Sequence, residues 1–588
     1  MKLKVEFNGS VRTVNLGLKM DCLLNNRVTR SNQALSCYSN NEDIAKDYDI
    51  FFDNYEFCNE VIYNLINSKE DIDLSYDYCR ILTSPWALTF SMIVFERYKS
   101  IYKLIGNKSL TIENNSLNPS FVLDRAADLF SYSQSDKFNN QIIIQILSAI
   151  ENYRGAENSS IIKCIIEENE FFNKSRLIDS DNPLPKNKFT QKVIDFIKYK
   201  LTKFIENLMN LRILRSSKVL FLLPEFSISD LTRIFFHQKF AFKIVHSIKI
   251  PKVKSAIKKR DFSGFSKVTI NSELSFVLQE LILKNLPMEF FENLNEYKAS
   301  AQSYIRKDVS RIITRSPTDT NPVVRHIMAF AHDMKILSIS MQHGGGYNNY
   351  ENHPLDLLER SLVDNYLVWG DISIKPSKVV GITKTSWFNL FSNNYYNSHG
   401  NLLIISPPLR RYYAGDFSYP TSFVFAYQKN MFKFINYFNN SIHKKIVYRM
   451  GWDFGVAEAE WVKGITSEIT ISTRENVSHA FKLVINSRLV VCTYNSSMWL
   501  ELSQLNHPFI LVLDKRYDLL TSLNENVFSE MEENNMLFYN SEDAAIHVSS
   551  CFNDPYHWWN TKKVQSTRLL ITKAFCDSFN PLEFAKSI

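Results

Sequence analysis

Residues 311–347, RIITRSPTDTNPVVRHIMAFAHDMKILSISMQHGGGY, decide the fold class of this chain. Two short runs of β-branched and apolar residues, 311–315 and 335–342, flank a segment with an amphipathic pattern. Near-continuous apolar strands that alternate with amphipathic helices are typical of parallel sheets with helices on both faces. The stretch therefore predicts one β–α–β unit of a doubly wound α/β domain.

This alternation continues along most of the chain after residue 215. A first series of apolar runs lies at 218–223, 242–248, 311–315, 335–342 and 365–370. A second series lies at 401–406, 445–450, 488–493, 508–513 and 536–540. A polar, Asn-rich stretch at 389–401 separates them and is the best candidate for a linker. We therefore predict two Rossmann-like domains that face one another across a cleft, at 215–388 and 400–560.

The first 214 residues have a different pattern. Apolar residues recur there at spacings of three and four, as in 141–153 and 188–214, which predicts a mainly helical region. A short strand pair, KLKVEF and VRTVNL, precedes the helices, with Asn8 and Gly9 as the hairpin turn. Residues 561–588 are expected to form a C-terminal helix. The predicted fold class is thus α/β, with two Rossmann-like domains and an all-helical N-terminal region.

The composition excludes several classes of protein. Hydrophobic residues make up 45% and charged residues 22%, which is ordinary for a globular protein and excludes collagen-like, coiled-coil and disordered chains. The net charge of +7 is too small to indicate a nucleic-acid partner. It is compatible with an anionic substrate or with peripheral binding to the inner face of a cell membrane.

The cysteines and the N-terminus indicate a cytoplasmic protein. The eight cysteines show no paired spacing, so we expect free thiols and neither a zinc site nor a disulfide framework. The N-terminus has no apolar signal segment. The most apolar run, 81–95, is shorter than the roughly 20 residues that a membrane-spanning helix needs, so we expect a buried helix.

The first candidate site is Gln342-His343-Gly344-Gly345, at the carboxyl end of the predicted strand 335–342. Glycine is scarce, with 15 residues where average usage would give roughly 41, yet three are consecutive at 344–346. Ligands of open α/β sheets bind at the carboxyl ends of strands, and glycine lets backbone approach them closely. The loop lacks the spacing of a GxGxxG or P-loop motif. The alternative is a flexible turn with a histidine that only packs.

The second candidate site is Asn495-Ser496-Ser497, which follows the predicted strand 488–493 and opens a helix. Asn495 or Ser496 is a natural N-cap, and the first turn of a helix favours an anion. The two hydroxyls would add donors to a phosphate, and Glu501, one turn further, could accept hydrogen bonds from a ribose. The alternative is an ordinary capped helix.

Arginines at strand ends form the third candidate site. Arg410 follows the predicted strand 401–406, and Arg449 ends the predicted strand 445–450. A guanidinium at such a position can hold a phosphate through two hydrogen bonds. Arg449 is the stronger candidate because apolar residues flank it, whereas Arg410 is equally compatible with a solvated loop charge.

Five stretches of the sequence together resemble a known family. They are CRILTSPWALTFSMIVFERY (79–98), SISMQHGGGYNNYENH (338–353), LVDNYLVWG (362–370), RLVVCTYNSSMWLELSQLNHP (488–508) and DPYHWWN (554–560). These stretches resemble a transferase family of bacterial surface-carbohydrate gene clusters, first catalogued in Leptospira. The sequence departs from the family pattern at Asn348 and Asn349, where a further glycine is expected.

The resemblance implies a glycosyltransferase of the GT-B type, which binds the acceptor on the first Rossmann-like domain and the nucleotide donor on the second. The Ser496-Ser497 pair also resembles the phosphate-binding serines of transferases that use CMP-activated sialic-type or Kdo-type acids. A CMP-sugar is therefore the favoured co-substrate, with no other cofactor, no metal and no nucleic acid. The acceptor would be a glycan or a lipid-linked oligosaccharide of a surface polysaccharide.

Such a reaction needs a general base for the acceptor hydroxyl. His343 is the first candidate, because imidazole exchanges a proton near neutral pH, and Asp319, Glu351 and Glu225 follow. Two alternatives stay open: a sugar-nucleotide epimerase of the same fold, and a non-catalytic scaffold that uses the helical region as a docking surface. The scaffold would be favoured if the two loops, 342–347 and 496–501, lay far apart.

Overall fold

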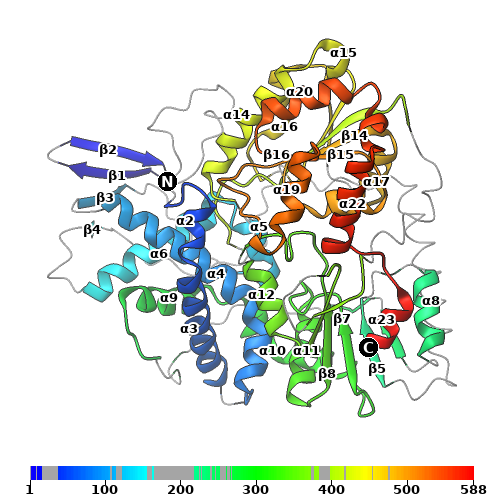
Figure 1. Cartoon of the computed structure of the whole chain (residues 1–588). Coiled ribbons are helices and arrows are strands. Elements are labelled where there is room, and N and C mark those ends of the chain that lie inside the picture. The colour runs from blue at the N-terminus through cyan, green and yellow to red at the C-terminus, as the bar shows by residue number, and fades with distance from the viewer. Residues whose placement is uncertain are drawn as a thin grey trace.

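The chain folds into two α/β units and a mainly helical N-terminal region (Figure 1). The computed structural model describes residues 2–7, 10–15, 37–69, 71–105, 109–113, 122–154, 162–163, 218–223, 226, 228–238, 242–245, 247–251, 260, 262, 265, 268–351, 353–371, 377–382, 397–415, 419–452, 454–473 and 477–588. The predicted helix at 188–214, the Asn8-Gly9 turn and most of the predicted linker lie outside these residues.

The first α/β unit contains a parallel six-stranded sheet in the order β10-β9-β8-β7-β5-β6. Its strands are β5 (Val219–Leu222), β6 (Phe242–Val245), β7 (Arg311–Thr314), β8 (Leu337–Met341), β9 (Asn365–Val368) and β10 (Ser377–Val379). Neighbouring side chains of a strand point to opposite faces. Ile312 accordingly packs in the core shared with the helical region, and Ile313 packs on the other face with Phe584. Both faces are covered, as the apolar runs predict.

The second α/β unit contains another parallel six-stranded sheet, in the order β13-β12-β11-β14-β15-β16. Its strands are β11 (Asn401–Ile405), β12 (Ile446–Arg449), β13 (Thr470–Ser472), β14 (Ser487–Cys492), β15 (Phe509–Val512) and β16 (Leu537–Phe538). Counted along the chain this is the Rossmann order 3-2-1-4-5-6, in which the strand order reverses between the first and fourth strands although all strands are parallel. The predicted fold class is therefore confirmed.

Helices cover both sheets. Those of the first unit are α8 (Ile228–His237), α9 (Glu273–Asn285), α10 (Leu294–Gln302), α11 (Pro322–Asp333) and α12 (Pro354–Ser361). Those of the second unit are α14 (Ser422–Asn436), α15 (Asn440–His443), α16 (Glu458–Ile465), α17 (Val477–Ile485), α18 (Ser497–Gln504), α19 (Glu525–Glu533), α20 (Ser541–Cys551) and α21 (Pro555–Trp559).

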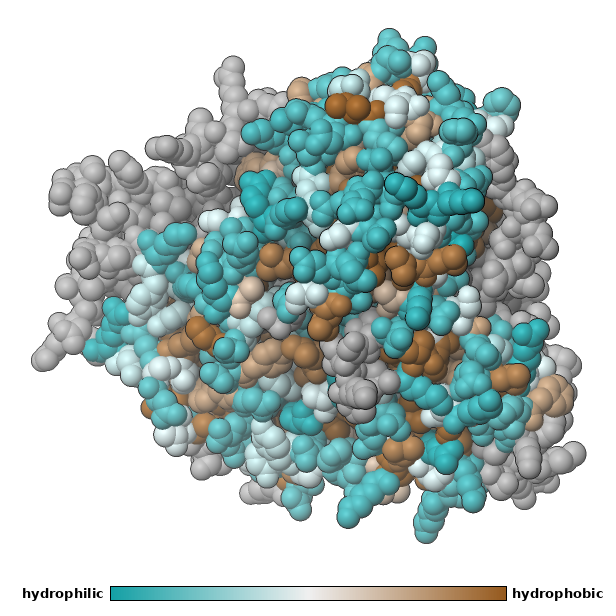
Figure 2. Space-filling model, in the orientation of Figure 1, coloured by the Kyte–Doolittle hydropathy of each residue, from teal (hydrophilic) through white to brown (hydrophobic). Residues whose placement is uncertain are grey.

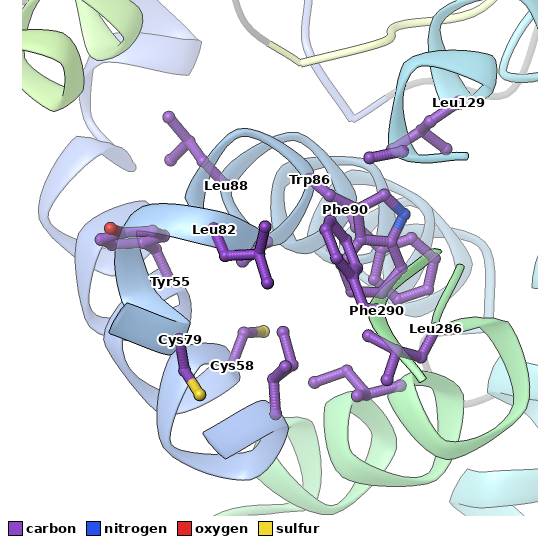
Figure 3. Packing of buried hydrophobic residues seen from close by; sticks show 14 of the residues in the cluster. Tyr55, Cys58, Cys79, Leu82, Trp86, Leu88, Phe90, Leu129, Leu286 and Phe290 are labelled. Carbon is purple, nitrogen blue, oxygen red and sulfur yellow. The ribbon is translucent and has the colours of Figure 1, made fainter. Parts of the chain in front are cut away.

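The N-terminal region shares its hydrophobic core with the first unit. Its helices are α2 (Asn41–Ala45), α3 (Tyr48–Asn67), α4 (Tyr76–Ile105), α5 (Leu129–Tyr132) and α6 (Asp136–Arg154). The apolar run 81–95 lies within α4, where Trp86 stacks on Phe90 at 4.4 Å beside Phe290 (Figure 3). Across the described ranges, no helix has both the length and the apolar character needed to cross a membrane. Figure 2 shows mostly hydrophilic side chains on one face of the molecule, with smaller hydrophobic groups between them.

A small sheet accompanies these helices. The predicted strand pair is present as β1 (Lys2–Phe7) and β2 (Ser10–Asn15), which are antiparallel. Two strands that the sequence pattern does not indicate, β3 (Ser109–Glu113) and β4 (Ile162–Lys163), complete the order β2-β1-β3-β4.

The C-terminal residues connect the two units (Figure 1). They form two helices, α22 (Lys562–Phe575), which packs on α18 and α19, and α23 (Pro581–Ser587), which packs on α8. The end of α22 and the chain that follows it lie against two glycines of the first unit. A Cβ at Gly370 would lie 2.2 Å from the Ala574 carbonyl oxygen, and one at Gly381 would lie 2.4 Å from that of Ser578. Glycine at both positions lets the backbones approach this closely.

Candidate active site

The glycine loop after β8 and the start of α18 touch one another where the two units meet. The Gly345 amide donates a 2.8 Å hydrogen bond to the Ser497 hydroxyl oxygen. A Cβ at Gly345 would lie only 2.4 Å from the Ser497 Cα, so only glycine fits there. The sequence predicts that the two motifs line opposite walls of a cleft. They are closer than that, in direct backbone contact.

Side-chain amides hold the glycine loop in its conformation. The Gln342 amide nitrogen donates to the Gly344 carbonyl oxygen at 2.9 Å, and the Gln342 side-chain oxygen accepts from the Trp369 amide at 3.0 Å. Asn348 has a φ of +62°, which asparagine tolerates better than most residues, so it can replace the glycine expected there. Asn349 donates to the Gly345 carbonyl oxygen. Gln342 therefore stabilises the conformation of the glycine loop through these two hydrogen bonds.

His343 lies at the mouth of a buried polar network centred on Glu359 of α12. Its Nε2 is 3.1 Å from Glu359 Oε1 and 2.8 Å from the Tyr347 hydroxyl. The His343 side chain is 26% exposed, whereas that of Glu359 is fully buried. A ligand could therefore reach the imidazole but not the carboxylate. The sequence pattern did not single out Glu359, which lies 16 positions from His343 on a different element.

The Glu359 carboxylate is surrounded by donors. Its Oε1 also accepts from the hydroxyls of Ser316, at 2.8 Å, and Thr318, while Oε2 accepts from the Tyr366 hydroxyl at 3.2 Å. Burial alone would raise the pKa of Glu359, but His343 and the hydroxyl donors outweigh it and hold that pKa below its usual value. Glu359 is therefore an ionised carboxylate in a buried position.

The start of α18 has the features expected of an anion site. Ser496 is the N-cap, and its hydroxyl oxygen accepts from the Met498 amide at 3.2 Å. Asn495 is 4% exposed, and its side-chain oxygen accepts from the Trp499 indole at 2.9 Å. Among the described residues, the Asn495 side-chain nitrogen has no hydrogen-bond partner. A buried donor without a partner is costly, so it marks a place where a ligand can complete the hydrogen bonding.

Arg449 and Glu501 both act electrostatically on Cys492 at the end of β14. Burial raises the pKa of the Cys492 thiol, Glu501 raises it further and Arg449 lowers it, so both charges are close to this strand end. Arg449 ends β12, next to Ile405 at the end of β11. Glu501 is 7% exposed on α18. The carboxyl ends of β11, β12 and β14 thus bring Arg449 and Glu501 to the same edge of the sheet as Ser496.

The remaining base candidates lie elsewhere or are occupied. Asp319 accepts from the Asn321 amide at 2.8 Å in the turn that opens α11, and it lies 3.6 Å from the Arg315 guanidinium. Glu351 accepts from the Ser522 amide at 3.0 Å, which ties the first unit to the second. Glu225 lies outside the described residues.

Arg410 is set among aromatic rings. Its guanidinium lies 4.5 Å from the Phe130 ring of α5 and 5.4 Å from the Phe454 ring. The next residue, Arg411, pairs with Asp136 of α6 at 3.0 Å. Both arginines therefore join the second unit to the helical region, and the sequence pattern indicated neither contact.

A buried cluster of hydroxyls and one carboxylate also joins the two units. Asp518 Oδ1 accepts from Tyr419 at 2.7 Å and from Tyr350, which belongs to the first unit, at 3.1 Å. Burial raises the pKa of Asp518 to about 6. In the part of the chain that the structure describes, no group of three His, Cys, Asp or Glu side chains is placed to hold a metal ion. The six described cysteines are free thiols, as expected.

Comparison with protein families identifies the chain. The model of the LIC12162 family transferases matches residues 23–583, almost the full length. The chain belongs to this family. The resemblance seen in the sequence is thereby confirmed, and the protein is a member of a transferase family. No functionally curated protein matches the sequence.

Several solved structures are distantly similar. The wall teichoic acid polymerase TagF is 12% identical, with a TM-score of 0.31 over 68% of this chain and 94% of TagF. A mutant of S. aureus TarM, in complex with Fondaparinux, alpha-GlcNAc-glycerol and UDP, is 11% identical, with a TM-score of 0.31 over 50% of this chain and 57% of TarM. UDP-GlcNAc 2-epimerase from Neisseria meningitidis is 11% identical, with a TM-score of 0.32 over 60% of this chain and 98% of the epimerase. Similarity this low carries no inference about activity.

Proposed function

We propose that this LIC12162 family transferase is a glycosyltransferase of bacterial surface-glycan synthesis that uses a nucleotide-activated sugar. The observation that carries the proposal is the contact between Gly345 and Ser497. This contact brings an accessible imidazole, His343, and a helix N-terminus into one site between two Rossmann-like units. A site of this kind could also transfer an acyl or a phosphoryl group. The resemblance to a family of surface-carbohydrate gene clusters favours transfer of a sugar.

The donor phosphate would bind at the start of α18. The first-turn amides and the dipole of that helix favour an anion, and the unpartnered side-chain nitrogen of Asn495 supplies a further donor. The Ser497 oxygen accepts from Gly345, and its hydroxyl hydrogen can still donate. Arg449 would stabilise the charge on the departing nucleotide, so the reaction would need no metal ion. CMP is the favoured nucleotide because of the paired serines.

The acceptor would be deprotonated by His343. A general base must reach the reacting hydroxyl, and the His343 side chain is accessible, while Asp319 is engaged in its turn. The acceptor would be a glycan or a lipid-linked oligosaccharide. In the latter case the enzyme would work in the cytoplasm at the inner face of the cell membrane.

Two observations weigh against the alternatives. The scaffold hypothesis is favoured if the two loops lie far apart, and they are in contact. The epimerase hypothesis predicts a different reaction class, and the chain belongs to a transferase family. The glycosyltransferase is therefore the function that the site supports best.

Nucleotide binding tests the proposal. The melting temperature should rise with CMP more than with UDP, GDP or TDP, since a ligand that binds only the folded state stabilises it. Replacing Arg449 by alanine should weaken nucleotide binding roughly ten- to a hundredfold, because a charge-assisted hydrogen bond contributes about 1.5–3 kcal/mol. A thermal-shift assay gives the melting temperatures, and isothermal titration calorimetry gives the affinities.

Arg488→Ala is the matched control. Arg488 lies on β14 near its start, where it bonds to the Gly400 and Phe552 carbonyl oxygens. Its loss should lower stability and leave the nucleotide affinity unchanged. Unchanged affinity in Arg449→Ala would remove that residue from the site, and no binding of any of the four nucleotides would refute the proposed donor.

A further inference from the structure

The proton on the imidazole of His343 can be assigned from the Glu359 network. Glu359 is ionised, because three hydroxyls and the imidazole surround it and hold its pKa low. An ionised carboxylate can only accept hydrogen bonds. The His343 Nε2, 3.1 Å from Glu359 Oε1, must therefore be the donor. In the neutral ring the lone pair then lies on Nδ1.

We propose that Glu359 is a positioning residue that makes Nδ1 of His343 the general base. This inference rests on the proposed function. Nδ1 takes the proton of the acceptor hydroxyl, while the acceptor oxygen forms a bond to the anomeric carbon. The bond from that carbon to the donor phosphate breaks, and its electron pair leaves with the nucleotide. The resulting imidazolium keeps Nε2–H on the carboxylate and later releases its Nδ1 proton to water.

Residues around Glu359 fix the orientation of the His343 ring. Burial lowers the pKa of His353 and so keeps that ring neutral, which lets His353 Nδ1 accept from the Asp356 amide at 3.1 Å and cap α12. The Tyr347 ring stacks on His353 at 5.2 Å and contacts His343 at 5.0 Å. The imidazole is thus held by packing on one side and by the carboxylate behind it. Such supporting contacts fix the orientation of a reactive group.

The tautomer of His343 tests the proposal without any substrate. The nitrogen chemical shifts of ¹⁵N-histidine-labelled protein show which ring nitrogen carries the proton, and His343→Asn identifies the resonances of His343. The wild type should show Nε2–H. Glu359→Leu removes the acceptor, and the Tyr347 hydroxyl, 2.8 Å from Nε2, can then donate to it, so the ring should shift toward Nδ1–H. An unchanged tautomer in Glu359→Leu would overturn the proposal.

Glu359→Gln tests the charge separately. The amide oxygen can still accept from Nε2, so the tautomer should persist, but the imidazolium loses its counter-charge. Release of CMP from CMP–N-acetylneuraminate should fall about 10–100-fold, the usual effect of such supporting groups, with an unchanged KM. Glu289→Gln is the matched control, since Glu289 is equally buried but pairs with Arg325. It should lower stability only.

The variants of Glu359 and His343 distinguish a failure of this inference from a failure of the proposed function. Wild-type turnover in Glu359→Gln would overturn the positioning role of Glu359. If Glu359→Leu does not fold, the turnover of Glu359→Gln decides whether Glu359 has that role. Near-normal turnover in His343→Asn would instead refute the catalytic base of the proposed function. A wild type that releases no CMP would count against the CMP-sugar donor, and the nitrogen shifts would still decide the role of Glu359.

Discussion

Gly345 is a residue at which the backbones of the two α/β units lie very close together. Its amide bonds to Ser497, and its missing side chain leaves room for the backbone of residues 496–497. This explains why a chain with few glycines has one at this position. At this position glycine allows the backbones of the two units to touch. The sequence suggested that it lets the loop backbone approach a ligand.

Replacing Gly345 by alanine should push the two units apart. The added Cβ would lie 2.4 Å from a backbone atom that cannot move alone, and overpacking of this kind costs about 1–3 kcal/mol. Urea unfolding should show this loss, and small-angle X-ray scattering should show a larger radius of gyration. Gly464→Ala is the control. Its Cβ would meet no atom within 4 Å in α16, so it should stabilise the protein by about 0.4–1 kcal/mol. Equal effects of the two variants would contradict this account.

At the scale of single elements, the start of α18 caps a helix, and we have proposed that it also binds phosphate, two roles that the sequence could not separate. Ser496 caps the helix, as serine does at many helix starts. The same helix start lies at the carboxyl edge of the Rossmann sheet beside the strand reversal, where ligands of such sheets bind. A substitution that keeps the cap and changes the charge can therefore distinguish an ordinary cap from a phosphate site.

Ser496→Asp is that substitution. Aspartate caps a helix as well as serine does, and a negative charge at the N-terminus is favourable, so the stability should be unchanged or slightly higher. A phosphate about 4 Å away would be repelled by about 1–4 kcal/mol, which should lower nucleotide affinity at least about fivefold. Ser272→Asp, at the N-cap of α9, makes the same change far from the site and should not affect nucleotide binding. Nucleotide affinity retained in Ser496→Asp would assign Ser496 to capping alone.

At the scale of the whole molecule, a short segment of the first unit docks on the second. The Glu351 amide donates to the Leu519 carbonyl oxygen at 2.9 Å, and the Thr521 amide donates to that of Asn349 at 3.0 Å. Tyr350 between them reaches the buried Asp518. The segment that holds the glycine loop therefore also fixes how the two units meet.

This junction should make stability depend on pH. The pKa of Asp518 is raised from 3.8 to about 6, so the folded state binds its proton more tightly than the unfolded state does. The stabilisation is complete below about pH 4 and is lost as the pH rises through about 6. Each pKa unit corresponds to about 1.4 kcal/mol, so the loss amounts to about 3 kcal/mol.

Thermal unfolding between pH 4.5 and 7.5 checks this prediction. Asp518→Asn should flatten the dependence in that window, whatever its effect on the absolute melting temperature. Glu583→Gln, in which a carboxylate of α23 paired with Lys586 is replaced, is the control. Lys586 lowers the pKa of Glu583, so this variant should keep the wild-type slope between pH 4.5 and 7.5. The same slope in wild type and Asp518→Asn would show that other groups cause it.

The pattern of apolar residues is enough to predict the class of fold and most of its strands. A strand buried on both faces requires an unbroken apolar run, so runs such as 488–493 became β14 and 401–406 became β11. The strands β10 and β13 were not predicted, because each is only three residues long and is too short to show an unbroken apolar run. The N-cap at Ser496 was predicted as one of two candidates, since capping depends on a few neighbouring residues.

Which residues meet follows from the tertiary packing and cannot be predicted from local patterns. Gly345 and Ser497 are 152 positions apart, and Glu359 reaches His343 from a separate helix. A pattern of apolar residues shows which face of an element is buried, but it does not show which element covers that face. The order of the strands and the docking of the units follow from packing over the whole chain, and they alone place a buried carboxylate behind an accessible imidazole.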